Sequence, residues 1–148
     1  MIINEGLICL DYNALKKEDI IKKSCEMAYM SGKLSGINEF YEAVKRREEE
    51  LSTDMGFGIA VPHGKTDAVK EAFVVFIRLN NEMIWDKAVG SKVKVILVLG
   101  APEHSEDNVH LKILSQLAAK LMDEGFLEVI KNVKDKKTIM GYFQSIQK

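Results

Sequence analysis

Short apolar blocks and longer amphipathic segments alternate along the chain, and this pattern predicts strands separated by helices. Residues 7–10, 72–79 and 93–99 are apolar blocks, and the last two are rich in the β-branched side chains typical of buried strands. The asparagines at 80–81 predict a turn, after which residues 83–85 predict a short edge strand. The block at 93–99 carries the strongest strand signal in the chain and ends at Gly100-Ala101-Pro102.

Other segments place apolar residues at helical spacing and therefore predict helices. They cover residues 16–31, 38–50, 105–123, 126–132 and 136–147. Asn38 is the expected N-cap of the second helix, Ser105 or Asp107 that of the third, and Gly125 is expected to break the third helix. Together the elements predict one α/β (α+β) domain over residues 1–148, with a mixed β-sheet flanked by helices on both faces.

Composition restricts the class of protein without naming a function. The chain has 148 residues, of which 47% are hydrophobic, and this is enough to bury the core of one domain. With 21 basic and 22 acidic residues the net charge is −1, so nothing favours a nucleic acid or an anionic membrane surface as partner. No apolar run is long enough to span a bilayer, and the N-terminus lacks a signal-peptide pattern. We therefore expect a cytoplasmic protein, with Cys9 and Cys25 as reduced core thiols.

One histidine follows a short apolar strand at a stiff point of the chain. Residues 59–61 have strand character, and Pro62 stops the strand because it has no N–H to donate. Gly64 permits backbone shapes and close approaches that a side chain would block. His63 is therefore expected at the end of a strand with open space beside it, facing a partner. A neutral imidazole nitrogen is a competent nucleophile near neutral pH. On these residues alone, His63 is either such a nucleophile or a histidine in an ordinary turn.

A second histidine, His110, belongs to the first turn of the predicted third helix. Positions 110, 114, 117 and 121 share one mostly apolar face. His110 is therefore either a core histidine or a site residue at the helix N-terminus, where a nearby anion is favoured. His104 belongs to a polar loop and is expected to be an ordinary surface histidine.

These motifs together resemble a known family. Residues 58–64 read GIAVPHG and follow Arg47-Glu48 and Ser52-Thr53, while Ala101-Pro102 precedes His110-Leu111. This order and spacing resemble the mannitol/fructose-type enzyme IIA domains of the phosphoenolpyruvate-dependent sugar phosphotransferase system, over essentially the whole chain. The resemblance implies a domain that accepts a phosphoryl group from the histidine-containing phosphocarrier protein and passes it to enzyme IIB of a membrane sugar permease.

The resemblance also implies a role for each site residue. His63 would be the phosphorylated nucleophile, Arg47 the charge clamp on the phosphoryl oxygens, and His110 the group that orients them by hydrogen bonding. The other charged residues between 45 and 50 are expected on a solvated helix face. Transfer between histidines needs no metal or cofactor, and the chain lacks a phosphate-binding GxxxxGK[ST] motif.

Two alternatives remain open from the sequence. A metal hydrolase would use His63, His104 and His110, although their spacing matches no usual ligand motif. A regulatory module, as in the nitrogen-regulatory branch of the same family, would keep the His63 site and use its phosphorylation state as a signal to protein partners. Neither the sugar nor the oligomeric state follows from the sequence.

Overall fold

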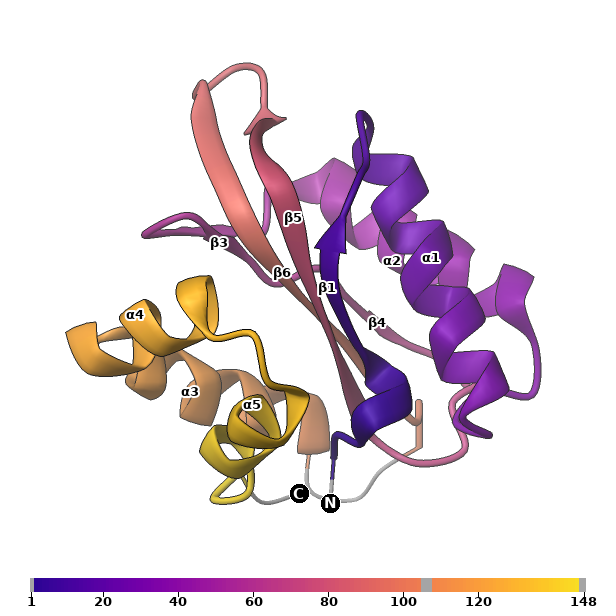
Figure 1. Cartoon of the computed structure of the whole chain (residues 1–148). Helices are drawn as coiled ribbons and strands as arrows, with labels where there is room; N and C mark the ends of the chain where they lie inside the picture. The colour runs from indigo at the N-terminus through magenta and orange to yellow at the C-terminus, as the bar shows by residue number, and fades with distance from the viewer. Residues whose placement is uncertain (1, 105–107, 147–148) are drawn as a thin grey trace.

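A mixed β-sheet lies between two layers of helices in the computed structural model of the chain, which describes residues 2–104 and 108–146 (Figure 1). One face carries α1 (Lys17–Met30) and α2 (Ile37–Glu50). The other face carries α3 (Val109–Leu121), α4 (Glu124–Asn132) and α5 (Lys136–Phe143). The predicted single α/β (α+β) domain with helices on both faces of a mixed sheet is confirmed.

Within the described residues the sheet has six strands: five follow the order β1-β5-β6-β3-β2, and β4 pairs with β6 outside this path. Their bounds are β1 Ile8–Tyr12, β2 Asp54–Gly56, β3 Ile59–Ala60, β4 His63–Lys65, β5 Phe73–Asp86 and β6 Ser91–Ala101. β5 and β6 are antiparallel, whereas β1 runs parallel to β5, and both β3 and β4 run parallel to β6. Since β3 and β4 pair with successive parts of β6, they form one interrupted strand beside β6, and the interruption is where Val61 and Pro62 lie.

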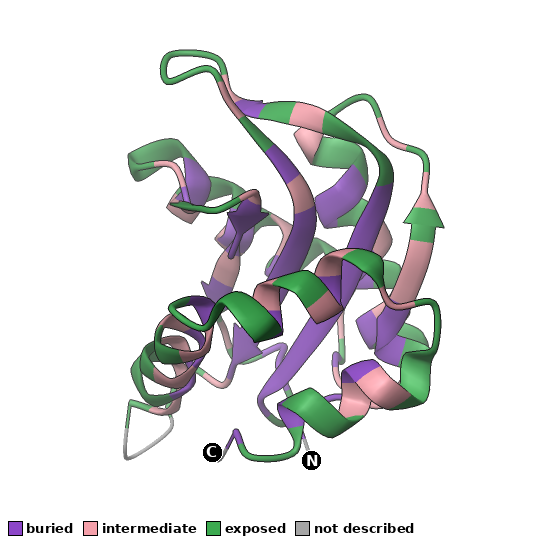
Figure 2. Ribbon diagram, turned by 60° about the vertical axis from the view of Figure 1, so that its left-hand side comes forward, coloured by how far each residue is buried: buried purple, intermediate pink, exposed green. Residues whose placement is uncertain are grey.

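The core is continuous through the sheet, because the central strands are covered on both faces. Residues 73–77 of β5 and 95–99 of β6 are fully buried, as expected for strands read as unbroken apolar runs. Phe40 of α2 packs against Phe73 with ring centroids 5.3 Å apart, and Phe143 of α5 packs against Phe76 at 6.1 Å. Figure 2 shows burial concentrated in these strands, with exposed residues on the outward sides of the helices.

The predicted turn at residues 80–81 is wrong. β5 continues through both asparagines to Asp86 and pairs with β6 beyond an irregularity between Arg78 and Met83. Asn80 and Asn81 are exposed there, so their polar side chains cost little in a strand that faces solvent. The chain turns instead at residues 87–90, where Gly90 adopts a φ of +77° that favours glycine. The predicted edge strand at residues 83–85 is therefore part of one long hairpin.

The helices occur where the sequence predicts them, with differences at their ends. The N-cap of α2 is Gly36, so Asn38 lies inside the helix. Gly125 does not act as a break by itself, because it lies in the first turn of α4 and donates its N–H to the Asp123 cap over 2.8 Å. The predicted caps Ser105 and Asp107 lie outside the described residues.

The two cysteines are free thiols, as predicted. Burial raises the pKa of the Cys25 thiol to about 12, which makes it an inert core side chain. Among the helices in the described part of the chain, none is long and apolar enough to cross a membrane.

Candidate functional site

A groove of about 500 Å³ lies where the C-terminal half of α2, strand β4 and the first turns of α3 meet. Its walls include Arg47 of α2, His63 of β4 and His110 of α3, three residues separated widely in the sequence. The structure thus brings the three predicted site residues to one place. Arg46 and Lys65 also line the groove, so basic side chains outnumber the one acidic lining residue, Glu50.

His63 is the first residue of β4 rather than the last residue of a strand. β3 pairs with β6 through Ile59 and Ala60, and β4 resumes the pairing with His63 opposite Leu99. Between them the chain remains attached to β6, because the carbonyl of Pro62 accepts a hydrogen bond from the Leu99 N–H over 3.0 Å. The imidazole is therefore fixed on a short edge strand whose backbone is bonded on both sides of the proline.

The close approach that Gly64 permits is made by α2, and the open space expected beside His63 is the groove itself. A Cβ atom at Gly64 would lie 2.9 Å from Val44 Cγ2 and 3.1 Å from Phe40 Cε1. Glycine is required here so that α2 can pack directly on the backbone of β4. This close packing sets the distance between the end of α2, which carries Arg47, and the strand that carries His63.

The backbone around His63 selects one tautomer of its imidazole. Nδ1 lies 3.0 Å from the carbonyl oxygen of Val61, and because a carbonyl only accepts hydrogen bonds, Nδ1 carries the proton. Nε2 is then the unprotonated nitrogen with a free lone pair. Burial lowers the pKa of His63; the Val61 carbonyl opposes this effect, the Arg47 charge adds to it, and the Glu48 charge opposes it. The ring is consequently neutral at neutral pH, as nucleophilic attack requires.

Arg47 lies one turn from the end of α2 and is half-buried. Its Nη1 donates to the carbonyl oxygen of Leu51, the C-cap residue of α2, over 2.9 Å. Arg46, by contrast, is exposed, and it also borders a second groove with Glu42 and Thr66. The two arginines thus differ in exposure, and it is the Arg47 charge that lowers the pKa of His63.

His110 is the second residue of α3 and lies in the groove, half-exposed, rather than in the core. The buried residues of α3 are Ile113, Leu117 and Leu121, so the last two belong to the expected apolar face, whereas His110 and Leu114 of that face are only partly buried and line the groove. Burial lowers the pKa of His110, and the charges of Lys65 and His63 lower it further. Its Nδ1 is buried and has no hydrogen-bond partner among the described residues.

One residue of the charged cluster was assigned wrongly from the sequence. Glu48 was expected on a solvated helix face, but it is buried on the same side of α2 as Phe40 and Val44. The i, i+4, i+8 spacing of these three positions was the available signal. Its burial matters for the site because Glu48 follows Arg47 directly and its charge acts on His63.

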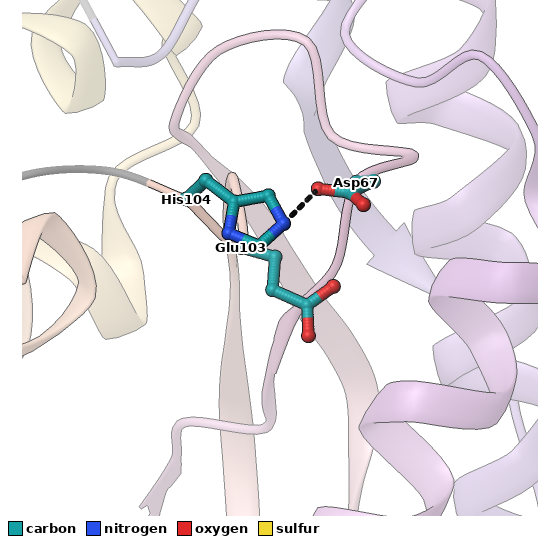
Figure 3. Close-up of side chains that lie close together, drawn as sticks. All are labelled: Asp67, Glu103 and His104. Atoms are coloured by element: carbon teal, nitrogen blue, oxygen red, sulfur yellow. Dashed lines mark ion pairs between the residues drawn. The ribbon is translucent and has the colours of Figure 1, made fainter.

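His104 lies outside the groove, as expected for a surface histidine. It is 82% exposed and forms an ion pair with Asp67 over 3.5 Å (Figure 3). Glu103 is the third member of this exposed group, whose possible ligand atoms all lie within 4.8 Å of one another. In residues 2–104 and 108–146, neither His63 nor His110 belongs to a group of possible metal ligands. The set His63, His104 and His110 is therefore not assembled as a metal centre.

Curated relatives of the chain include stand-alone and multidomain proteins. The fructose-specific EIIA component of the phosphotransferase system from Haloferax volcanii is 32% identical over 140 residues, covering 95% of this chain and 90% of the relative. The 2-O-alpha-mannosyl-D-glycerate-specific EIIABC component from Escherichia coli is 33% identical over 124 residues, covering 83% of this chain. The chain spans only 19% of that relative's length.

Solved structures share the fold over almost the whole chain. The nitrogen regulatory protein IIA-Ntr from Neisseria meningitidis matches with a TM-score of 0.84 and 28% identity, covering 95% of this chain and 94% of its own. A second match is the mannitol enzyme IIA from Escherichia coli, solved in complex with phosphorylated mannitol enzyme IIB. Its TM-score is 0.80 at 22% identity, covering 94% of both chains.

The family model described as "Phosphoenolpyruvate-dependent sugar phosphotransferase system, EIIA 2" matches residues 1–146. That range includes every strand and helix of the structure and the whole groove around His63. The chain belongs to the EIIA 2 family of the phosphoenolpyruvate-dependent sugar phosphotransferase system.

Proposed function

We propose that the chain is a single enzyme IIA domain that carries a phosphoryl group on Nε2 of His63. The donor is the histidine-containing phosphocarrier protein, and the acceptor is a sugar-specific enzyme IIB in the cytoplasm, so that transfer is coupled to sugar uptake. The observation that supports this proposal is the basic groove that joins His63, Arg47 and His110. The structural neighbour in which mannitol enzyme IIA is bound to phosphorylated enzyme IIB supports the class of acceptor.

The proposed step moves one phosphoryl group between nitrogen atoms. The lone pair of His63 Nε2 attacks phosphorus in line with the bond to the donor imidazole; that bond breaks, and its electron pair stays with the donor nitrogen. The Nδ1 proton of His63 remains on its hydrogen bond to the Val61 carbonyl throughout. Passage to enzyme IIB repeats the displacement, with His63 as the leaving group and the acceptor's nucleophile in its place.

The groove residues would stabilise charge on the transferring group. Arg47 can use several N–H donors because only Nη1 is bonded to Leu51. His110, beside the N-terminus of α3, would donate a hydrogen bond to a phosphoryl oxygen. No metal or cofactor is needed, since the charges are supplied by side chains and the phosphoryl group comes without a nucleotide.

A regulatory role is the second candidate. The structural match to nitrogen regulatory protein IIA-Ntr supports it, whereas the match to the fructose-specific EIIA component supports transport. Both candidates retain phosphorylation of His63 and differ in the protein that responds to it.

Reconstituted phosphorylation tests the proposal. The chain is incubated with phosphoenolpyruvate, enzyme I and the phosphocarrier, and mass spectrometry at neutral or basic pH is expected to show one added phosphoryl group. Adding an enzyme IIB of the fructose or mannitol type should then discharge the label. A control without the phosphocarrier should remain unlabelled. Absence of labelling in the complete mixture would contradict the proposal, and labelling without discharge to any enzyme IIB would favour the regulatory role.

Substitution of His110 separates a role in transfer from a role in packing. We expect His110→Ala to slow transfer by about a hundredfold, the lower end of the effect seen when one preorganised donor is lost. The melting temperature should change little, because the side chain is half-exposed in the groove. Rates and melting temperatures are measured on the same samples, with His104→Ala as the matched histidine control. Normal transfer with a clearly lower melting temperature would assign His110 to packing instead.

A further inference from the structure

A buried carboxylate, Glu48, lies in the last turn of α2, next in sequence to the groove residue Arg47. The Glu48 side chain is only 5% exposed, and its Oε2 accepts hydrogen bonds from Lys17 Nζ (3.2 Å), the Thr53 N–H (3.1 Å) and Trp85 Nε1 (3.2 Å). Its Oε1 accepts a further bond from the Thr53 hydroxyl. These donors come from α1, from the segment after α2 and from β5. Glu48 thus joins three parts of the fold through one side chain.

A continuous path of hydrogen bonds leads from Glu48 to the imidazole of His63. Glu48 holds Thr53 by both its N–H and its hydroxyl. The carbonyl of Thr53 accepts from the Val61 N–H over 2.9 Å, and the carbonyl of Val61 accepts from His63 Nδ1 over 3.0 Å. Glu48 therefore holds Thr53, Thr53 holds the Val61 peptide, and the Val61 carbonyl selects the tautomer of His63.

We infer that Glu48 is a positioning residue for His63, which holds the Thr53–Val61 backbone so that the imidazole keeps its proton on Nδ1 and its lone pair on Nε2. The inference deepens the proposed function, because it concerns how the phosphoryl acceptor is oriented. Glu48 itself does not line the groove and does not touch the transferring group.

Packing alone gives a weak reason for a charge at this position. Burying a carboxylate costs free energy that its partners only partly return, and well-packed apolar residues often serve stability equally well. Phe40 and Val44 fill the preceding positions of the same face. A carboxylate, however, can accept from a backbone N–H, a hydroxyl, an ammonium and an indole at once, and this fixes the geometry of Thr53 in a way that an apolar side chain does not.

Charge gives Glu48 a second influence on the same imidazole. Burial is the main effect that lowers the pKa of His63, Arg47 lowers it further, and Glu48 acts in the opposite direction. Removing the carboxylate should therefore lower the pKa of His63 and make Nε2 a weaker base. The geometric path and the charge act together toward a well-oriented, sufficiently basic nitrogen.

The test measures the His63 ring directly, in the unphosphorylated protein, by ¹⁵N NMR. Wild type is expected to show the Nδ1-protonated tautomer almost alone. Glu48→Ala should show a mixture of tautomers, a lower His63 pKa, and transfer that is slower by about tenfold, comparable to the loss of partners that orient metal-ligating histidines. Glu48→Gln keeps the shape and much of the hydrogen bonding, so it should keep the tautomer, lower the pKa and restore part of the rate.

Arg78→Met is the matched control, because Arg78 is the other charged side chain deeply buried among the described residues of the chain. It donates to the carbonyls of Ile130 and Val133 at the end of α4 and pairs with Asp11, outside the site. We expect it to lower stability but leave the His63 tautomer unchanged. Trp85 is the only tryptophan, so its emission reports whether the contact with Glu48 persists in each variant.

The outcomes separate this inference from the proposed function. If the folded Glu48→Ala protein keeps the wild-type tautomer and pKa of His63, or if Arg78→Met shifts the tautomer equally, the positioning role is wrong. Should Glu48→Ala fail to fold, an unchanged His63 pKa in Glu48→Gln would overturn the inference. The NMR measurement needs no phosphoryl donor, so it decides on Glu48 even if His63 proves not to be phosphorylated.

Discussion

Replacing His63 with alanine or glutamine is expected to abolish phosphoryl labelling of the chain, because no other groove residue offers a neutral nitrogen held in the same way. Nε2 of His63 owes its free lone pair to the Nδ1 bond with the Val61 carbonyl, and glutamine fills similar space without a nucleophilic nitrogen. Labelling is followed by mass spectrometry after incubation with phosphoenolpyruvate, enzyme I and the phosphocarrier. The loss should be complete within detection, not a reduction in rate.

Two controls make the His63 result specific. His104→Ala removes an exposed histidine outside the groove and should label normally. The label on wild type should be lost in acid and retained in base, as expected for phosphohistidine rather than phosphoserine. Full labelling of His63→Ala, or a label mapped to His110 or His104, would contradict the assignment.

The sequence predicts the centre of this fold better than its periphery. Residues 73–77 and 95–99 are fully buried, so both sides of each strand need apolar residues. The resulting unbroken apolar runs can be recognised in the sequence without knowing which elements pack on them. Asn80 and Asn81 carry a turn signal that the hairpin overrides, because β6 offers continued pairing and the asparagine side chains face solvent. The N-cap of α2 is Gly36 rather than the predicted Asn38, because Gly36 supplies the required extended backbone without a capping side chain.

The site was predictable where a residue's chemistry is local and unpredictable where it depends on packing. Pro62 and Gly64 mark His63 in the sequence, but the sequence does not show that α2 is the element that packs on Gly64. The spacing of His110 fits either a core or a site residue, and only its half-exposed position in the groove distinguishes the two. The burial of Glu48 is hard to predict because it stands in a run of charged residues and its hydrogen-bond donors Lys17 and Trp85 are distant in the sequence.

Arg47 and Glu48 show how one helix end can serve two purposes. Neighbouring residues of a helix point about 100° apart, so α2 directs Arg47 to the groove and Glu48 into the protein. The close approach of α2 to β4 at Gly64 holds both near His63. A shift of α2 would therefore alter the clamp and the inferred positioning residue together.

Arg47→Ala is expected to reduce phosphoryl transfer by about a hundredfold or more, the range observed when a cationic or oxyanion-stabilising group is removed. Phosphorylation places close to two negative charges on His63. A cation about 4 Å from a unit charge gains roughly 4 kcal/mol at an effective dielectric of 20, before desolvation is subtracted. Arg47→Gln should be similarly impaired, and Arg47→Lys should recover only part of the rate, because ammonium keeps the charge but lacks the two-pronged donor geometry.

Arg46→Ala is the matched control for Arg47, since it removes the same side chain from the adjacent position of the same helix. Arg46 is exposed and lies between this groove and a second one, so its loss should be mild. Its small effect should shrink further at high salt, because exposed charges are screened. The Arg47 effect should persist at high salt, because Arg47 is less exposed than Arg46 and would bond the phosphoryl oxygens directly. Transfer rates are measured for all four variants at both salt concentrations. If Arg46→Ala strongly reduces transfer and Arg47→Ala does not, the arginine that holds the phosphoryl oxygens is Arg46.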